Sequence, residues 1–338
     1  MGKRLVAFLS VLAFLVVGFG LPQAAMAKKY KNYIIATATP GGTYYPVGVA
    51  IATLINVKLA KKGITATAIT SAGSGENIQL LKNKEADFAI LQGLFGSMAY
   101  NGKGLYKDKP QRFFYAVTAL WPNVEHFSLL KKYVKTGNIM DLKGLHERFS
   151  IGKRGSGTEG SGRTILGALG IDVGKDIYPV YLGYNPSIDA MINGRIAGAN
   201  TPAGPPVAAI TRLFAKLGSK KVAILNFTDE QLKKIDSTYD VWYRYVIKPG
   251  TYPGQDKPIY TIAQPNFLAV RKGVPQEDVY LIVKTIYENL PFLHNIHKAT
   301  YYLGLDNAIK GLPVPLAPGA AKYYKEKGVK IPAKLIAK

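Results

Sequence analysis

The feature that most constrains the fold is a regular alternation of short apolar runs with longer amphipathic segments. Residues 33–39, 64–71 and 88–92 have the apolar and β-branched composition of buried strands. Residues 45–62 and 75–86, which lie between them, carry the longer apolar–polar period of helices. Strands that alternate with helices in this way predict an α/β fold with a largely parallel sheet.

The same pattern starts again in the second third of the chain, where strands are expected at residues 127–131, 148–153, 179–182, 196–200 and 222–227. We interpret Trp121-Pro122-Asn123 and Lys248-Pro249-Gly250 as the breaks between two halves. The prediction is an α/β fold with two lobes, each a sheet flanked by helices, and two hinge crossovers. The first lobe takes residues 28–120 and 249–338, with a long helix over 275–297, and the second takes residues 121–248.

The first 27 residues have the pattern of a secretory signal peptide. Lys3 and Arg4 precede an apolar stretch over residues 5–19, and Ala25-Met26-Ala27 provides small residues for cleavage. The alternative is a permanent membrane anchor, for which the apolar stretch is short. We therefore expect a mature protein outside the cytoplasm, in the periplasm.

The chain has an unusually high positive net charge. It has 44 Lys and Arg residues against 21 Asp and Glu, a formal net charge of +23, and no cysteine that could form a disulfide or a thiolate site. A solvated basic surface and electrostatic steering of anionic solutes both remain open as explanations. Nucleic-acid binding is disfavoured, because the basic residues are spread along an exported chain.

In open α/β sheets, ligands bind beyond the carboxyl ends of the strands. The loops of interest therefore follow residues 39, 71, 92, 153 and 182. Three of these loops are glycine-rich turns before a helix, at residues 40–46, 71–77 and 153–160, where free N–H groups and the helix dipole favour an anion. The candidate contacts in them are Gly42, Thr43, Tyr44 and Tyr45, then Ser74 and Asn77, then Arg154, Ser156, Gly157 and Thr158.

Each turn also has a plainer interpretation. The tyrosines of the first turn could pack in the core, and Ser74 could merely cap its helix. The third turn contains G-x-G-x-x-G, the shape of a dinucleotide-binding fingerprint, but an exported protein meets little nicotinamide cofactor. We expect no cofactor.

Signals for catalysis and for metal binding are weak. The chain has no G-x-S-x-G motif, and no acid–base pair can be placed from the sequence. His294 and His297 are three residues apart on an expected helix but have no acidic cluster nearby, so we expect neither a metal site nor an enzyme.

Several separated motifs resemble the TAXI family, the extracytoplasmic solute receptors of tripartite ATP-independent periplasmic (TRAP) transporters. They are Gly41-Gly42-Thr43-Tyr44-Tyr45-Pro46, Gly75-Glu76-Asn77, Gly155-Ser156-Gly157-Thr158-Glu159, Pro249-Gly250-Thr251-Tyr252, and a tail over residues 311–320 followed by Tyr323-Tyr324. The resemblance covers residues 33–328. It implies a periplasmic-binding-protein fold of the class II kind, a small anionic solute and a TRAP membrane permease as partners, and no nucleic acid.

The resemblance also implies a solute such as glutamate, glutamine or a related C5 carboxylate, and we expect a monomer that binds such an acid or a C4–C5 dicarboxylate. Relatives often have Gln-Ser-Asp after the third strand, where this chain has Gln92-Gly93-Leu94. Gln92 is therefore a further candidate contact, while the missing acid favours a carboxylate without an amine. The alternative function is an exported enzyme or binder whose glycine-rich turns hold a phosphate-containing ligand.

Overall fold

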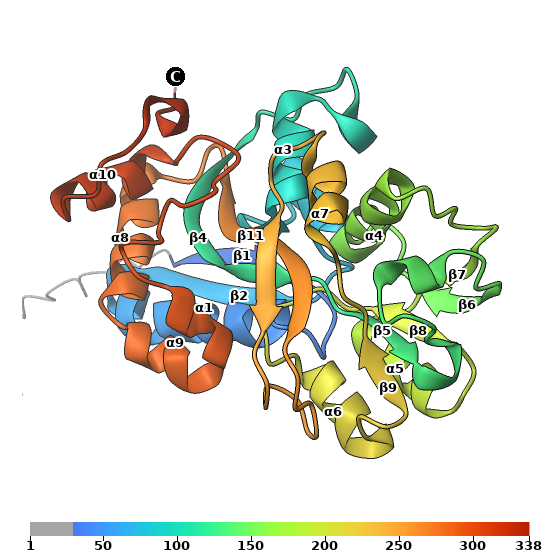
Figure 1. Cartoon of the computed structure of the whole chain (residues 1–338). Helices are drawn as coiled ribbons and strands as arrows, with labels where there is room; N and C mark the ends of the chain where they lie inside the picture. Colours follow the sequence, from blue (N-terminus) through green and yellow to red (C-terminus); the bar gives the residue numbers. More distant parts are fainter. Residues whose placement is uncertain (1–29, 338) are drawn as a thin grey trace, which may run out of the picture.

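The computed structural model describes residues 30–337; the expected signal peptide, residues 1–27, lies outside this part. Its elements form two α/β lobes side by side, each with its own sheet (Figure 1). No helix within residues 30–337 is both long and apolar enough to cross a membrane.

The first lobe contains a mixed six-stranded sheet in the order β10-β11-β3-β1-β2, with β4 paired to β11. Strands β1, β2 and β3 are parallel to one another in the order β2-β1-β3, whereas β11 runs antiparallel to β3, β4 and β10. The bounds are β1 Lys31–Ala36, β2 Ile64–Ile69, β3 Phe88–Gln92, β4 Phe114–Val124, β10 Tyr243–Ile247 and β11 Ile259–Arg271.

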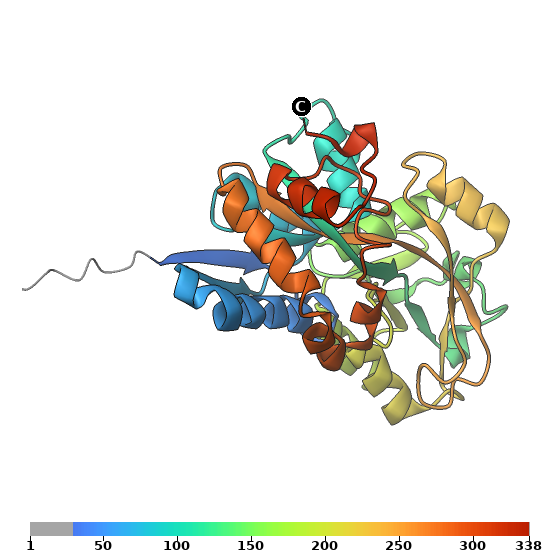
Figure 2. The same cartoon turned by 90° about the vertical axis from the view of Figure 1, so that its left-hand side faces the viewer.

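The helices of the first lobe cover its sheet and bury one continuous apolar core. The C-terminal helix α10 packs on α8 so closely that a Cβ at Gly319 would lie 2.0 Å from the Gln276 carbonyl oxygen (Figure 2). The bounds are α1 Tyr44–Leu59, α2 Ser74–Lys82, α3 Gly93–Asn101, α8 Gln276–Tyr287, α9 Leu290–Ile296 and α10 Pro318–Glu326.

The second lobe contains a five-stranded sheet in the order β7-β6-β8-β5-β9, with separate apolar clusters on its two faces. Its strands are β5 Phe127–Leu130, β6 Glu147–Ser150, β7 Ile177–Val180, β8 Gly198–Asn200 and β9 Val222–Ile224. Its helices are α4 Gly157–Ala168, α5 Tyr184–Ile192, α6 Ala208–Leu217 and α7 Asp229–Asp236. At α7, Thr228 and Gln231 form the capping box that their spacing predicts.

The lobes are joined where β4 runs into β5 through only Glu125 and His126. The Glu125 N–H donates to the Ile262 carbonyl at 3.0 Å, so this crossover lies beside β11. Strand β10 pairs with β11 in the first sheet, although it lies before the expected return crossover at residue 249. The junction is therefore built from β4, β10 and β11 together.

Two expected element boundaries are wrong. Strand β4 continues through Trp121-Pro122-Asn123, because Pro122 faces Pro265 of β11 beside a register shift, where a missing N–H is tolerated. The single helix expected over residues 275–297 is two helices, α8 and α9. The second begins at Leu290 with Pro291 in its first turn, a position that suits proline.

Candidate functional site

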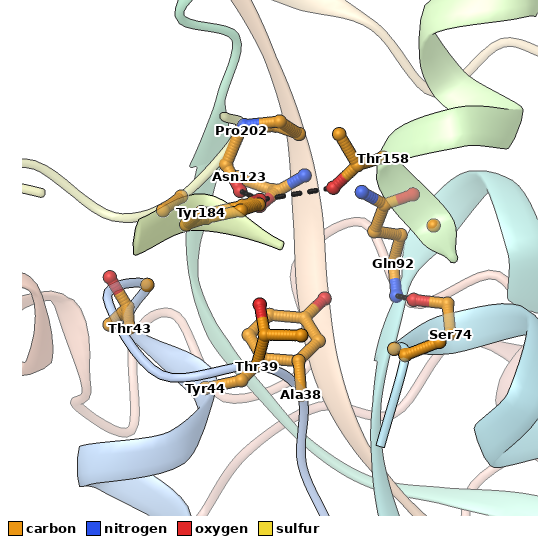
Figure 3. A pocket seen from close by; sticks show the side chains of 15 residues that line it. Ala38, Thr39, Thr43, Tyr44, Ser74, Gln92, Asn123, Thr158, Tyr184 and Pro202 are labelled. Carbon is orange, nitrogen blue, oxygen red and sulfur yellow. Dashed lines mark hydrogen bonds between the residues drawn. The ribbon is translucent and has the colours of Figure 1, made fainter. Parts of the chain in front are cut away.

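A small cavity lies between the lobes, at the carboxyl ends of the central strands. The space in which the centre of a water molecule could move is about 30 Å³, so the cavity is small. Figure 3 shows side chains from both lobes pointing into it. It is lined by Ala38, Thr39, Gly42, Thr43, Tyr44, Ala72, Gly73, Ser74, Gln92, Asn123, Gly157, Thr158, Tyr184, Pro202 and Ala203.

Five helices begin at this cavity. The first residue or N-cap of each one lines it: Tyr44 for α1, Ser74 for α2, Gln92 for α3, Gly157 for α4 and Tyr184 for α5. The first N–H groups of a helix have no partner within the helix, and the dipole makes this end positive. Five such ends at one cavity create a local field that favours negative charge.

Some of these N–H groups already have partners. The Gln92 N–H donates to Ser74 Oγ at 3.0 Å, and the Leu94 N–H donates to Gln264 Oε1 at 2.8 Å, which uses the start of α3. The Glu159 N–H donates to Ser156 Oγ at 3.0 Å. The Glu76 N–H of α2 also has a partner, the Gly155 carbonyl, so the starts of α1 and α5 have the larger capacity to bind a ligand.

Tyr184 organises the polar groups on the side of the second lobe. Its hydroxyl donates to the Pro202 carbonyl at 2.5 Å and lies 3.1 Å from Thr158 Oγ1 (Figure 3). Because the one phenolic proton goes to Pro202, Thr158 donates to Tyr184. Burial raises the pKa of Tyr184 well above its ordinary value, so the phenol stays neutral.

Tyr44 has the corresponding place in the first lobe. Its hydroxyl donates to Asn266 Oδ1 of β11, and its ring lies edge-on to Trp121, with centroids 6.1 Å apart. Burial raises the pKa of Tyr44 well above its ordinary value. Tyr44 therefore contributes a neutral wall held in place by both β4 and β11.

Two polar atoms at the cavity have no hydrogen-bond partner among the described residues, Gln92 Oε1 and Asn123 Nδ2. Gln92 is 3% exposed and Asn123 is 1% exposed, so neither is satisfied by bulk solvent. Buried polar groups without partners are rare and costly in folded proteins. A solute that has both a hydrogen-bond donor and an acceptor would satisfy these two atoms.

The lobes meet across the cavity through glycines. A Cβ at Gly75 would lie 2.2 Å from the Gly155 carbonyl oxygen, and a Cβ at Gly157 would lie 2.8 Å from Ser74 Oγ. The Glu76 N–H donates across the gap to the same Gly155 carbonyl at 3.1 Å. Only residues without a side chain allow the two backbones to approach this closely.

The structure brings seven of the eleven candidate residues to the cavity. They are Gly42, Thr43, Tyr44, Ser74, Gln92, Gly157 and Thr158. Four of the five loops chosen from the sequence supply lining residues, including the loop after residue 182, and at the fifth the lining residue is Gln92 at the end of β3. The loops that local patterns selected therefore meet around one cavity.

The other four candidates do not line the cavity, each for a different reason. The Asn77 amide is buried and donates to the Thr37 and Ile90 carbonyls at 2.8 and 2.9 Å, so it ties α2 to the sheet. Arg154 is exposed and stacks over the Tyr181 ring at 3.7 Å.

Ser156 caps α4 and lines a different hollow. Tyr45 is half-buried next to Tyr44 without contributing to the lining. The lining contains no Asp, Glu, Lys or Arg, which corrects the expectation of an arginine partner.

Eight of the fifteen lining residues are not among the sequence candidates, and Asn123, Tyr184 and Pro202 are the three of these that belong to the polar network or carry an unpartnered group. Tyr184 lies in the loop after residue 182, which the sequence analysis selects, but Asn185-Pro186 has the pattern of a helix cap and first residue, whereas α5 begins at Tyr184 with Gly183 as its N-cap. Asn123, which the sequence analysis places in a break, lies inside β4, one residue before its end. Within residues 30–337, no group of three or more His, Cys, Asp or Glu residues is placed to hold a metal ion.

A comparison with known families matches residues 35–328 to a family described as NMT1-like. This chain belongs to the NMT1-like family. The match includes every cavity-lining residue and both lobes. The finer assignment to the TAXI receptors is not part of this finding.

Solved structures show the same fold as this NMT1-like chain. MatC from Rhodopseudomonas palustris with bound malate is 12% identical, with a TM-score of 0.52, and the match covers 87% of this chain and 97% of MatC. A protein from Bordetella bronchiseptica RB50 is 15% identical, with a TM-score of 0.51, and the match covers 90% of this chain and 91% of the other. The two-lobed periplasmic-binding-protein fold expected from the sequence is confirmed.

Proposed function

We propose that this protein is an extracytoplasmic solute receptor that encloses a small carboxylate between its lobes and delivers it to a membrane permease of the TRAP type. The observation that carries the proposal is the convergence of five helix starts on one small cavity between two lobes. On this interpretation the protein binds its solute without chemical change and is not an enzyme. It acts in the periplasm and as a monomer.

The chemistry of the lining supports an anion held by neutral groups. Helix-start N–H groups and hydroxyls can surround a carboxylate without any cationic side chain, and charge-assisted hydrogen bonds of this kind are the stronger ones. The orphaned Asn123 Nδ2 is a further donor for a carboxylate oxygen. A fixed cationic ammonium on the solute would find no Asp or Glu in the lining.

Gln92 Oε1 restricts the class of solute further. It is an acceptor without a partner, so the solute should carry a hydrogen-bond donor. A hydroxyl or amide group beside the carboxylate would satisfy it. The small size of the cavity favours a small acid over a large one, and the C4–C5 range is what the resemblance to the TAXI receptors suggests. The bound malate in the MatC structure is consistent with this class, and the TAXI-like motifs support the choice of transporter.

The test is a thermal-shift screen of paired acids that differ in one group, namely succinate with malate, and glutarate with glutamate and glutamine. A solute present at one hundred times its dissociation constant stabilises the folded state by about 2.7 kcal/mol. We expect malate to raise the melting temperature more than succinate does. A protein that responds to no carboxylate but to phosphate or a phosphate ester would instead support the phosphate-binding alternative.

Variants of the cavity locate the binding. Asn123→Ala should weaken binding of the best acid by about tenfold or more, since it removes an unpartnered donor to a charged group, worth about 1.5–3 kcal/mol. Arg154→Ala is the matched control, because Arg154 lies beside the lobe junction but outside the lining. Equal loss in the control would contradict the proposed site.

A further inference from the structure

The crossover between β4 and β5 contains a carboxyl group that is fully buried. Glu125 is 0% exposed, and its Oε2 accepts a hydrogen bond from Asn200 Nδ2 at 2.7 Å. Its Oε1 has no hydrogen-bond partner among the described residues. No Lys or Arg in residues 30–337 forms an ion pair with it.

The partner amide is equally unusual. Asn200 is 1% exposed, and its Oδ1 also has no partner among the described residues. An ionised Glu125 would thus leave two buried acceptor oxygens without donors on two side chains that are already joined. A proton on Glu125 Oε1 turns one of these acceptors into a donor, and an acid and an amide then complement each other at both ends.

This pair lies close to the cavity, since the Glu125 carboxyl group is near enough to the lining residue Tyr184 to contribute to the raised pKa of that phenol. The Ser161 hydroxyl also lies beside the Glu125 carboxyl group, so three polar side chains form a layer there. Each of the three shares a segment with a cavity-lining residue two or three positions away: Glu125 with Asn123, Asn200 with Pro202, and Ser161 with Thr158. A charge on Glu125 would therefore be felt by a solute in the cavity.

We propose that Glu125 is a positioning residue that carries a proton while solute is bound, and that the neutral acid–amide pair with Asn200 allows a carboxylate to occupy the cavity close to it. The effect on carboxylate binding rests on the proposed function. The protonation of Glu125 does not, because it is inferred from the geometry of the Glu125–Asn200 pair alone.

The surroundings of Glu125 support a neutral carboxyl group near neutral pH. Burial raises the pKa of Glu125 to about 8, although the Asn200 amide and the Ser161 hydroxyl partly oppose this effect. From β11, the Thr261 hydroxyl donates to the Glu125 main-chain carbonyl, which adds no charge.

Two other ionisable groups face this region. Burial, together with the nearby Glu125, raises the pKa of Tyr184 on α5. Burial lowers the pKa of His126 to about 4, and the His126 ring is bonded to the Val124 carbonyl and the Tyr252 hydroxyl. Glu125 is thus the group in this region whose charge changes between pH 6.5 and 9.

The first experiment is independent of any solute. Infrared spectra of the wild-type protein, recorded from pH 6.5 to 9.5, should contain the C=O stretching band of a protonated carboxylic acid, which disappears as the pH rises. The band should be absent from Glu125→Gln, in which an amide replaces the acid and can still pair with Asn200 at both ends. A band of equal size in Glu125→Gln, or no such band in the wild-type protein, would overturn the proposal.

The second experiment measures binding of malate, succinate and glutarate by calorimetry at the same pH values. The affinity of the wild-type protein should be constant at low pH. Above about pH 8 it should decrease, by no more than about tenfold for each pH unit, since a charge at Glu125 repels the anion. Glu125→Gln should bind with an affinity that does not depend on pH. By reciprocity, binding to the wild-type protein near pH 8 should take up protons.

Glu159→Gln is the matched control. Glu159 is a second carboxylate at the lobe junction, bonded to the Gly155 N–H and to Arg163, and it lies outside the cavity lining. This variant should keep the wild-type pH profile. An unchanged profile in Glu125→Gln would overturn the effect on binding. If no acid binds at any pH, the proposed solute class fails, and the infrared band alone decides the state of Glu125.

Discussion

The closest approach of the two lobes can be blocked by one methyl group at Gly75. Gly75 is the second residue of α2, and a Cβ there would lie 2.2 Å from the Gly155 carbonyl oxygen in the other lobe. Ordinary contact begins near 3.4 Å, so Gly75→Ala requires the turns to separate by about 1 Å. That shift also breaks the 3.1 Å hydrogen bond from the Glu76 N–H to Gly155.

The expected magnitude follows from these contacts. Overpacking against a backbone atom costs about 1–3 kcal/mol. Because only the closed arrangement carries this cost, it appears as a loss of affinity of roughly 5- to 150-fold. Within a helix, alanine is favoured over glycine by about 1 kcal/mol, so the variant should not unfold more easily in the absence of solute.

The assay is calorimetric titration with the acid that gives the largest thermal shift, combined with thermal unfolding without solute. Gly167→Ala is the matched control, because it also replaces a helical glycine but its Cβ would meet nothing within 4 Å. We expect Gly75→Ala to lose affinity while Gly167→Ala keeps it. Wild-type affinity in both variants would refute the view that solute is held in this closed arrangement.

Three further predictions concern residues around the cavity. Ser156→Ala removes the cap of α4 and should lower the free energy of unfolding by about 1 kcal/mol, measured by urea denaturation, with affinity unchanged. Asn77→Ala leaves buried carbonyls unpaired and should cost about 2–4 kcal/mol in the same measurement; a loss of affinity without a loss of stability would return Asn77 to the binding site. The pKa of Glu125 is raised from 4.5 to about 8 in the folded protein. The contribution of Glu125 to the free energy of unfolding is therefore complete below pH 4.5 and is lost as the pH rises through about 8. At about 1.4 kcal/mol per pH unit, wild-type stability should fall by at most about 5 kcal/mol relative to Glu125→Gln, and parallel curves for the two proteins would contradict this.

Much of the surroundings of the cavity could be predicted because the signals are local. A glycine-rich turn between a strand and a helix depends on residues within one short segment, and Thr43, Ser74 and Gly157 from three such turns line the cavity. The bounds of β3 and the capping box at α7 were also predicted, for the same reason.

Side-chain partners from distant segments could not be predicted in this way. Arg154 turns away from the cavity because the Tyr181 ring, 27 positions later, offers it a cation–π contact. The Asn77 amide donates hydrogen bonds to carbonyls of β3 and of the loop after β1, and these carbonyls lie near Asn77 only when the sheet has formed.

The sequence by itself determined the alternation of strands and helices and the glycine turns at which helices begin, because period and capping are properties of neighbouring residues. Only the tertiary structure decided that Asn123, Tyr184 and Pro202 complete the cavity and that Glu125 is buried close to it against Asn200. These placements depend on how β4 crosses between the lobes and on which strand pairs with it. That register is set by packing between segments tens of residues apart, and no local pattern in the chain encodes it.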